Sequence, residues 1–107
     1  MKSDAVQELK PGYTVADIRK LAAPVAEKHG VKSLSLFGSY ARGDADGESD
    51  VDFLIESGAI TSLFKYYAFV LDLEDALGRH VDVITEGIED KEFWNSIKKD
   101  EVLLYEA

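Results

Sequence analysis

The sequence predicts an α/β (α+β) fold, in which helices flank a small mixed sheet of three to four strands. Short apolar segments typical of strands recur at 31–37, 50–56 and 80–84. Longer segments with apolar residues at helical spacing lie before, between and after them. A chain of 107 residues has room for one domain with one modest core. We therefore expect a single domain over 1–107, in which 1–13 is a short flexible lead-in.

The first predicted helix begins after Thr14 and ends at Gly30. Threonine is a favourable N-cap, and glycine is common just beyond a helix C-terminus. Pro24 lies inside this segment, where it removes a backbone donor and crowds the preceding turn. We therefore expect a kinked helix or two short helices. The apolar residues at helical spacing are Val15, Ile18, Leu21, Ala22, Val25 and Ala26.

The predicted strand over 31–37 leads into a Gly-Ser turn and a short helical piece at 40–43. Residues 44–49 contain three acids, a glycine and a serine, which is loop composition. The strand that follows opens with two carboxylates. Since residues alternate faces along a strand, Asp50 and Asp52 should project to one side and the apolar residues next to them to the other. One face can then belong to the core while the other carries chemistry.

Three elements and a tail complete the predicted order. A helix over 61–78 is amphipathic, with apolar residues at steps of three and four, and ends at a glycine. A short strand over 80–84 follows, and after Gly87 a last helix covers 90–99. The tail, 101–107, is apolar enough to form an edge strand or an extended arm.

Asp50 and Asp52 are the first candidates for a functional site. Two carboxylates held side by side repel each other, so one of them should resist ionising unless a cation lies between them. Mg²⁺ suits such a site, because it binds a few carboxylate oxygens together with substrate phosphates. Gly38 lets a ligand approach the backbone, and Ser39 offers a hydroxyl and an amide N–H to a phosphate. These four residues predict a metal–nucleotide site.

The spacing of these residues resembles a family signature. Gly38-Ser39, ten intervening residues and Asp50-x-Asp52 are similar to the signature of the DNA polymerase β-like nucleotidyltransferase superfamily. The Ala41-Arg42-Gly43 and Ser49-Asp50 details resemble its minimal nucleotidyltransferase (MNT) branch. The family pattern adds a third carboxylate on a later strand, which Asp82 supplies. The resemblance therefore implies the polymerase β-like nucleotidyltransferase fold.

The resemblance also implies a two-metal mechanism. Asp50, Asp52 and Asp82 would be the catalytic residues and would hold two Mg²⁺ ions, or Mn²⁺, which suits the same oxygen ligands. Gly38 and Ser39 would bind the β- and γ-phosphates of ATP, so that attack falls on the α-phosphorus and pyrophosphate leaves.

Several other polar and aromatic residues have a structural explanation as well as a functional one. Arg42 either contacts a nucleotide phosphate or braces the loop or a partner. Tyr40 either stacks on a base or packs its ring against the following helix. His29 lies at a helix end, where a cation is favoured, and His80 precedes a strand with no expected ligand company. Of the remaining residues, a solvated helix face is expected for Asp72, Glu74 and Asp75, and the core for Phe93 and Trp94, which would be interface anchors if exposed.

The resemblance also implies a partner. Small MNT proteins are often encoded with a HEPN-domain ribonuclease, as the antitoxin of a type VII toxin–antitoxin pair that transfers AMP to a tyrosine hydroxyl of the toxin. The chain has no room for a second substrate-binding domain, which agrees with an acceptor on another molecule in a hetero-oligomer. Two alternatives stay open: a non-catalytic antitoxin that neutralises by occlusion, and a small-molecule nucleotidyltransferase of the aminoglycoside type.

The charge distribution disfavours direct nucleic-acid binding. The formal net charge is −9, and residues 44–107 carry five Lys or Arg against seventeen Asp or Glu. An acidic surface repels a phosphate backbone, whereas a basic protein partner or a metal–nucleotide complex is compatible with it.

The absence of cysteine restricts the chemistry and leaves the redox compartment undetermined, whereas the hydropathy pattern bears on the location. There are no cysteines, so disulfide and thiolate chemistry are excluded. The N-terminus lacks an apolar signal region, and no segment approaches the roughly 18 apolar residues of a membrane span. We therefore expect a cytoplasmic protein without membrane contact.

Overall fold

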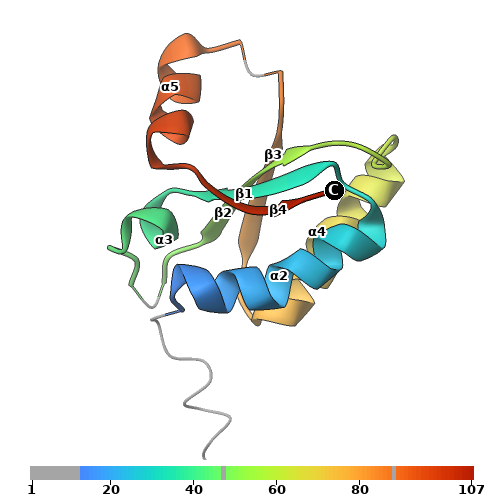
Figure 1. The fold of residues 1–107 in the computed structure, drawn as a ribbon, viewed down its shortest axis with the longest axis horizontal. Helices are drawn as coiled ribbons and strands as arrows, with labels where there is room; N and C mark the ends of the chain where they lie inside the picture. The colour runs from blue at the N-terminus through green and yellow to red at the C-terminus, as the bar shows by residue number, and fades with distance from the viewer. Residues whose placement is uncertain (1–12, 47, 88) are drawn as a thin grey trace, which may run out of the picture.

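Four strands form one mixed sheet in the order β3-β2-β1-β4 (Figure 1). The structure is a computed structural model that describes residues 13–46, 48–87 and 89–107. Within these residues the elements are α2 (Val15–His29), β1 (Ser33–Phe37), α3 (Ser39–Arg42), β2 (Val51–Glu56), α4 (Leu63–Leu77), β3 (Val81–Thr85), α5 (Lys91–Asp100) and β4 (Val102–Glu106).

The strands pair in both directions. β1 is antiparallel to both β2 and β4, whereas β2 and β3 are parallel. Parallel neighbours need a crossover connection, and α4 is that crossover. The predicted mixed sheet flanked by helices is confirmed, and the C-terminal tail is an edge strand.

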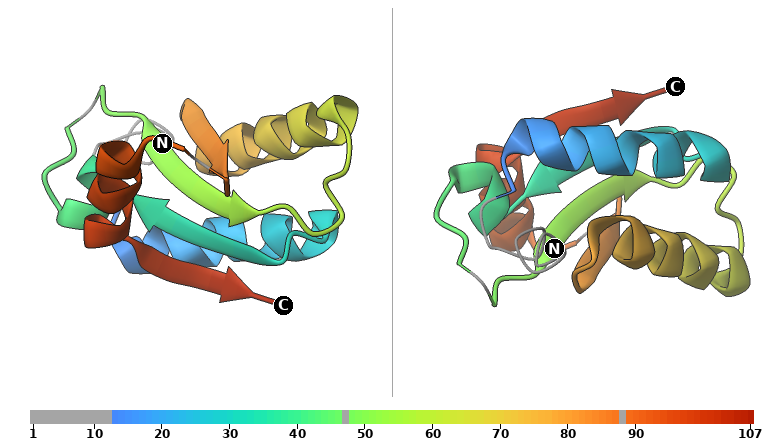
Figure 2. Two further views of the ribbon diagram at one scale, coloured as in Figure 1. Left: turned by 90° about the horizontal axis from the view of Figure 1, so that it is seen from above. Right: turned by 90° about the horizontal axis from the view of Figure 1, so that it is seen from below.

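Helices lie on both faces of the sheet. α2 and α4 pack together against one face, and α5 lies over one end of the other (Figures 1 and 2). The main core contains Val51, Phe53 and Ile55 of β2 together with side chains of α2 and α4. A smaller cluster of Phe37, Leu54 and Ile97 lies on the α5 side. Because side chains alternate along β2, Asp52 shares the α5 face with Leu54.

α2 runs through Pro24 as one helix, so the alternative of two short helices is wrong. Its start is fixed by a capping box, in which the Asp17 N–H donates to the Thr14 hydroxyl at 3.1 Å and the Thr14 N–H donates to the Asp17 carboxylate at 2.9 Å. The buried face of the helix, which includes Ile18 and Ala22, packs in the main core and offsets the hydrogen bond that Pro24 removes.

α4 is confirmed as a helix, but its outer side is not polar. Phe69, Leu73 and Leu77 are buried, as an amphipathic helix requires. Four more large apolar side chains of α4 are exposed to solvent, which the prediction of an amphipathic helix did not anticipate: Leu63, Phe64, Tyr67 and Leu71.

An ion-pair cluster joins α2 to α4. The Asp72 carboxylate lies 2.6 Å from His29 Nε2 and 3.2 Å from Lys28 Nζ. The hydrogen bonds from His29 and Lys28 hold the pKa of Asp72 below its ordinary value. The Asp72 side chain keeps 40% of its surface exposed, as predicted for a solvated helix face, but the packing of the two helices adds these partners, which the sequence did not indicate.

Two expectations concern other parts of the chain. The predicted lead-in, 1–13, lies outside the described residues except for Tyr13, whose hydroxyl donates to the Leu77 carbonyl at 2.7 Å. Over residues 13–46, 48–87 and 89–107, none of the helices combines the length and the apolar character that crossing a membrane requires.

Candidate active site

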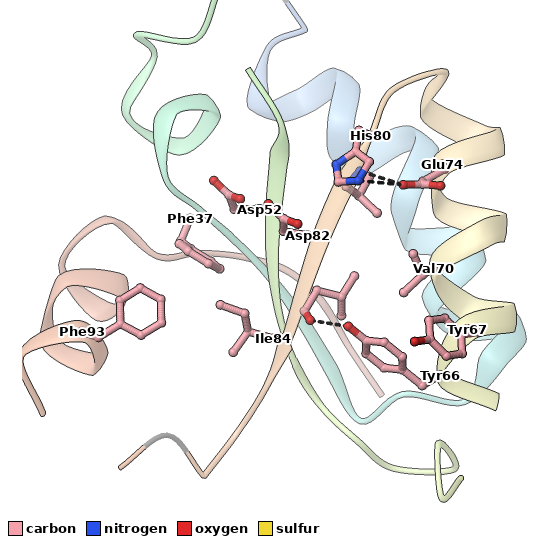
Figure 3. Close-up of a pocket in the computed structure, with 12 residues that line it drawn as sticks. Phe37, Asp52, Tyr66, Tyr67, Val70, Glu74, His80, Asp82, Ile84 and Phe93 are labelled. Carbon is pink, nitrogen blue, oxygen red and sulfur yellow. Dashed lines mark hydrogen bonds and ion pairs between the residues drawn. The ribbon is translucent and has the colours of Figure 1, made fainter. Parts of the chain in front are cut away.

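Carboxylates from β2 and β3 lie side by side on the α5 face of the sheet (Figure 3). Asp52 and Asp82 are register partners in this parallel pair, so their side chains leave the same face as neighbours. Asp50 immediately precedes β2, and His80 immediately precedes β3. The Val51 N–H donates to the His80 carbonyl at 3.2 Å, so the hydrogen-bond ladder between β2 and β3 extends to the residues just before both strands. The three predicted carboxylates are thus brought together at one end of two adjacent strands.

Asp52 is the carboxyl group most affected by this arrangement. Partial burial raises its pKa from 3.8 to about 6, helped by the negative charges of Asp82 and Asp50 and by a hydrogen bond with Asp82, whereas Arg42 acts in the opposite direction. The raised pKa means that the charged form of Asp52 is less favoured than in a free aspartate, because burial and the neighbouring carboxylates leave its negative charge without balance. A bound cation would provide that balance.

The Gly-Ser turn lies against Asp52. Phe37 is the register partner of Asp52 in the β1–β2 ladder, so the chain passes the carboxylate at the next residue, Gly38. A Cβ on Gly38 would collide with Oδ2 of Asp52. The backbone at Gly38 has φ 78° and ψ −154°, which is accessible almost only to glycine. Ser39 follows as the first residue of α3, so both predicted nucleotide-binding residues border the carboxylates.

Arg42 points from α3 to acids outside the carboxylate cluster. Its Nε donates to Asp44 and its Nη1 donates to Asp100, each at 3.2 Å. These bonds brace the loop after α3 against the end of α5, which is one of the predicted alternatives. Contact with a phosphate stays a prediction. Tyr40, from the same short helix, is buried in the main core, in agreement with packing rather than base stacking.

His80 lies beside two carboxylates that could share a metal ion with it, so the prediction that it has no such neighbours is wrong. Its Nδ1 lies 3.4 Å from Asp50 Oδ1, and one donor atom from each of Asp50, His80 and Asp82 lies within 4.8 Å of the other two. Glu74 of α4 approaches His80 Nε2 at 3.9 Å and accepts the Val81 N–H at 3.2 Å, so it does not belong to a merely solvated face. The missing signal was the parallel register, which places residue 80 opposite residue 50. This donor set fits a divalent cation.

Replacing His80 by alanine is expected to weaken Mg²⁺ binding about tenfold, because Asp50 loses the neighbour that orients it. The measurement is the Mg²⁺ dependence of the nucleotide transfer that the family resemblance implies, in which the half-saturating concentration should rise while the rate at saturating Mg²⁺ stays near that of the wild type. His29→Asn changes the other histidine, which pairs with Asp72 far from the carboxylates, and serves as the control. An unaltered Mg²⁺ dependence in His80→Ala would contradict this role.

A groove of about 570 Å³ runs from the carboxylates across β3 to α4. Figure 3 shows Asp52, Asp82, Ile84 and Phe93 on one side of it and the residues of α4 on the other. Phe93 is half-exposed here, so its predicted core position is wrong. Trp94 packs against the small cluster under α5. The lining on the α4 side consists of Tyr66, Tyr67, Val70 and Glu74.

Comparison with known proteins gives relatives for most of the chain. Residues 18–104 match the nucleotidyltransferase domain family. “Putative protein adenylyltransferase MJ0435” of Methanocaldococcus jannaschii is 42% identical over 71 residues, which are 66% of this chain and 76% of that protein. Protein adenylyltransferase MntA of Thermococcus cleftensis is 43% identical over 58 residues, 54% of this chain and 59% of that protein.

Solved structures share the fold at low sequence identity. A toxin–antitoxin crystal structure with AMP-PNP has a TM-score of 0.70 and 17% identity, covering 83% of this chain and 73% of that chain. A structure of a tri-AMPylated HEPN toxin of Shewanella oneidensis in complex with an MNT antitoxin has a TM-score of 0.62 and 15% identity, covering 84% of this chain and 71% of that chain. At this level of identity the likeness shows the fold alone.

Proposed function

Because the chain belongs to the nucleotidyltransferase domain family, we propose that it transfers AMP from ATP to a hydroxyl group of a partner protein. The relatives named as protein adenylyltransferases support this choice of donor and acceptor. The proposed acceptor is a tyrosine of a HEPN-domain toxin, and the chain is then the antitoxin of a type VII pair. The shared fold of MNT antitoxins in toxin complexes supports this partner.

The observation that carries the proposal is the juxtaposition of Asp52, Asp82 and Gly38. Two carboxylates in register on parallel strands, one of them with a raised pKa, form a site that a bound cation would stabilise. The backbone of Gly38 passes directly beside them without a side chain in the way. A triphosphate can therefore approach the carboxylates closely from the Gly-Ser side.

In the proposed reaction the acceptor hydroxyl oxygen attacks the α-phosphorus of ATP. A P–O bond forms to the acceptor, the bond from the α-phosphorus to the oxygen that bridges to the β-phosphate breaks, and pyrophosphate leaves. The hydroxyl proton passes to the Asp82 carboxylate and then to water. Gly38 and Ser39 bind the β- and γ-phosphates, and Arg42 adds a positive charge on the same side. Positioning and charge neutralisation account for most of the rate.

Asp50, Asp52 and Asp82 are the residues that would hold Mg²⁺, or Mn²⁺, in this reaction. Such ions, when bound, neutralise the triphosphate and favour ionisation of the attacking hydroxyl. The exposed positions of Asp50 and Asp82 leave room for substrate oxygens beside the protein ligands.

The test is transfer of label from α-³²P-ATP with Mg²⁺ to the HEPN-domain protein encoded beside this chain. Wild type and the Asp50→Asn/Asp52→Asn double variant are compared, and γ-³²P-ATP is the matched control, since the proposed bond cleavage leaves that label in pyrophosphate. We expect label on the partner only when the wild type is combined with α-³²P-ATP, and none with the double variant or with γ-³²P-ATP. Substitution of the modified tyrosine by phenylalanine should then remove it.

Two results would contradict the proposal and select an alternative. A partner that is bound and silenced but carries no label would indicate an antitoxin that acts by occlusion. Label on an added aminoglycoside and none on the protein partner would indicate a small-molecule nucleotidyltransferase.

A further inference from the structure

The outer side of α4 presents a stripe of apolar side chains that no other described residue covers. We define the α4 stripe as Leu63, Phe64, Tyr67 and Leu71. Phe64 is 84% exposed, Leu63 68% and Leu71 63%. Phe64, Tyr67 and Leu71 stand three, four and seven positions apart, so they share one side of the helix, and Leu63 lies four positions before Tyr67 at its edge. Contiguous exposed apolar residues of this size are typical of an interaction site.

The α4 stripe is continuous with the groove that begins at the carboxylates. Tyr67 belongs to both: it is a member of the stripe and lines the groove that starts at Asp52 and Asp82. Figure 3 shows Tyr67 beside Tyr66 on the groove side of α4, across β3 from the half-exposed Phe93. A molecule seated on the stripe can therefore extend a side chain along the groove to the carboxylates.

Two outward-facing backbone groups of the edge strand β3 are already hydrogen-bonded to α4, which hinders pairing with an added strand. The Val83 carbonyl accepts the Tyr66 hydroxyl at 2.6 Å, and the Val81 N–H donates to Glu74 at 3.2 Å. Both groups point away from β2, because alternate residues of a strand direct their N–H and C=O groups to opposite sides. α4 thus covers groups that an extended peptide would need. An occupant of this surface binds through side chains rather than as an extra strand.

The charge of the chain disfavours a second copy of itself as the occupant. The formal net charge is −9, and the groove end of the surface carries Glu74, Asp52 and Asp82. A second copy would bring another acidic surface to this one, whereas a partner without that excess of acids would not be repelled.

We propose that the α4 stripe and the adjoining groove are the docking surface for the acceptor protein, which places apolar side chains on Phe64 and Leu71 and extends the acceptor hydroxyl toward Asp82. This inference rests on the proposed function. Apolar contacts over α4 supply affinity, and the groove selects a hydroxyl carried on a side chain long enough to reach the carboxylates from the stripe. Free hydroxyl compounds, which lack an apolar protein surface, do not use the stripe.

The test uses Phe64→Glu/Leu71→Glu in the full chain, with Leu103→Glu as the matched control. Leu103 is a half-exposed apolar residue of β4, at the opposite edge of the sheet. The probe is the HEPN-domain protein encoded beside this chain, fluorescently labelled. Its binding is measured by anisotropy without ATP, and its modification is measured separately with α-³²P-ATP. Loss of two central apolar anchors is expected to raise the Kd about tenfold or more.

The expected result is weaker partner binding in the double variant, a higher KM for the partner with an unaltered kcat, and unaltered ATP binding. Leu103→Glu should behave as the wild type. Equal Kd and KM in the double variant and the wild type would overturn the docking surface. So would a wild-type dimer, seen by sedimentation, that the double variant dissociates without loss of partner binding, because the occupant would then be a second copy.

These measurements separate the two proposals. If the wild type binds the partner but transfers no label, the transferase proposal fails while a raised Kd in the double variant still supports the docking surface. If the wild type labels the partner and the double variant labels it equally well at low partner concentration, the docking surface fails while the transferase proposal stands. A partner that does not bind the wild type overturns the docking surface directly.

Discussion

Replacing Asp52 by asparagine is expected to lower AMP transfer by about three orders of magnitude, through the loss of several kcal/mol of transition-state stabilisation. Asparagine keeps the size of the side chain but removes the charge that lies beside Asp82 and the Gly38 backbone. The measurement is the initial rate of label transfer from α-³²P-ATP. Asp75→Asn, which changes an exposed acid of α4 elsewhere on the surface, is the control and should keep the wild-type rate.

The same variant is expected to be more stable than the wild type when metal is removed. The pKa of Asp52 is about 6 in the folded protein and 3.8 ordinarily, so folding favours its protonated form. The stability that this proton provides is fully present below pH 3.8 and is lost as the pH rises through 6. In EDTA, the melting temperature of Asp52→Asn minus that of the wild type should therefore increase as the pH rises from about 4 to about 7.

With Mg²⁺ at neutral pH, the wild type should instead be more stable than Asp52→Asn. A cation stabilises the ionised carboxylates of the wild type and has one fewer charged ligand in the variant. Melting curves with EDTA and with Mg²⁺ plus a non-hydrolysable ATP analogue check both signs. A variant that transfers AMP at the wild-type rate, or that responds to Mg²⁺ as the wild type does, would contradict the assignment of Asp52 as a metal ligand.

The parts of the site that the sequence predicted are those set by local pattern. Alternation along a strand is enough to place Asp50 and Asp52 on one face and Val51 and Phe53 in the core, and the structure has this arrangement. Spacing alone also led to Gly38 as the point where a ligand reaches the backbone, and its dihedral angles and closeness to Asp52 agree with that role.

The parts that the sequence did not predict depend on how elements pack. His80 and Glu74 reach the carboxylates only because β3 pairs with β2 in parallel and α4 covers the edge of β3. Neither the register nor the rotation of α4 can be derived from periodicity, because α4 has apolar residues on its inner and outer sides alike. The α4 stripe became visible only in the structure for the same reason, and the exposed position of Phe93 became visible there because it depends on how α5 packs on the sheet.

Replacing Gly38 by alanine is expected to reduce transfer by about two orders of magnitude or more, because the new methyl group occupies the space of the Asp52 carboxylate. Two costs combine at this position. The backbone, at φ 78° and ψ −154°, is strained for any residue with a Cβ, by about 1–3 kcal/mol. The collision with Oδ2 then moves Asp52 away from Asp82 or shifts the turn that would bind the phosphates.

Gly43→Ala separates these two costs. Gly43 also has a positive φ, 88°, but a Cβ there has no neighbour within 4 Å. The control should therefore lose stability by about 1–2 kcal/mol from backbone strain and keep nearly full transfer. Initial rates and melting temperatures of both variants are the measurements. If Gly38→Ala loses no more activity than Gly43→Ala at equal loss of stability, then glycine is needed at residue 38 for the turn alone. A far larger loss of activity in Gly38→Ala would mean that this residue is glycine because Asp52 and a triphosphate must meet directly beside its backbone.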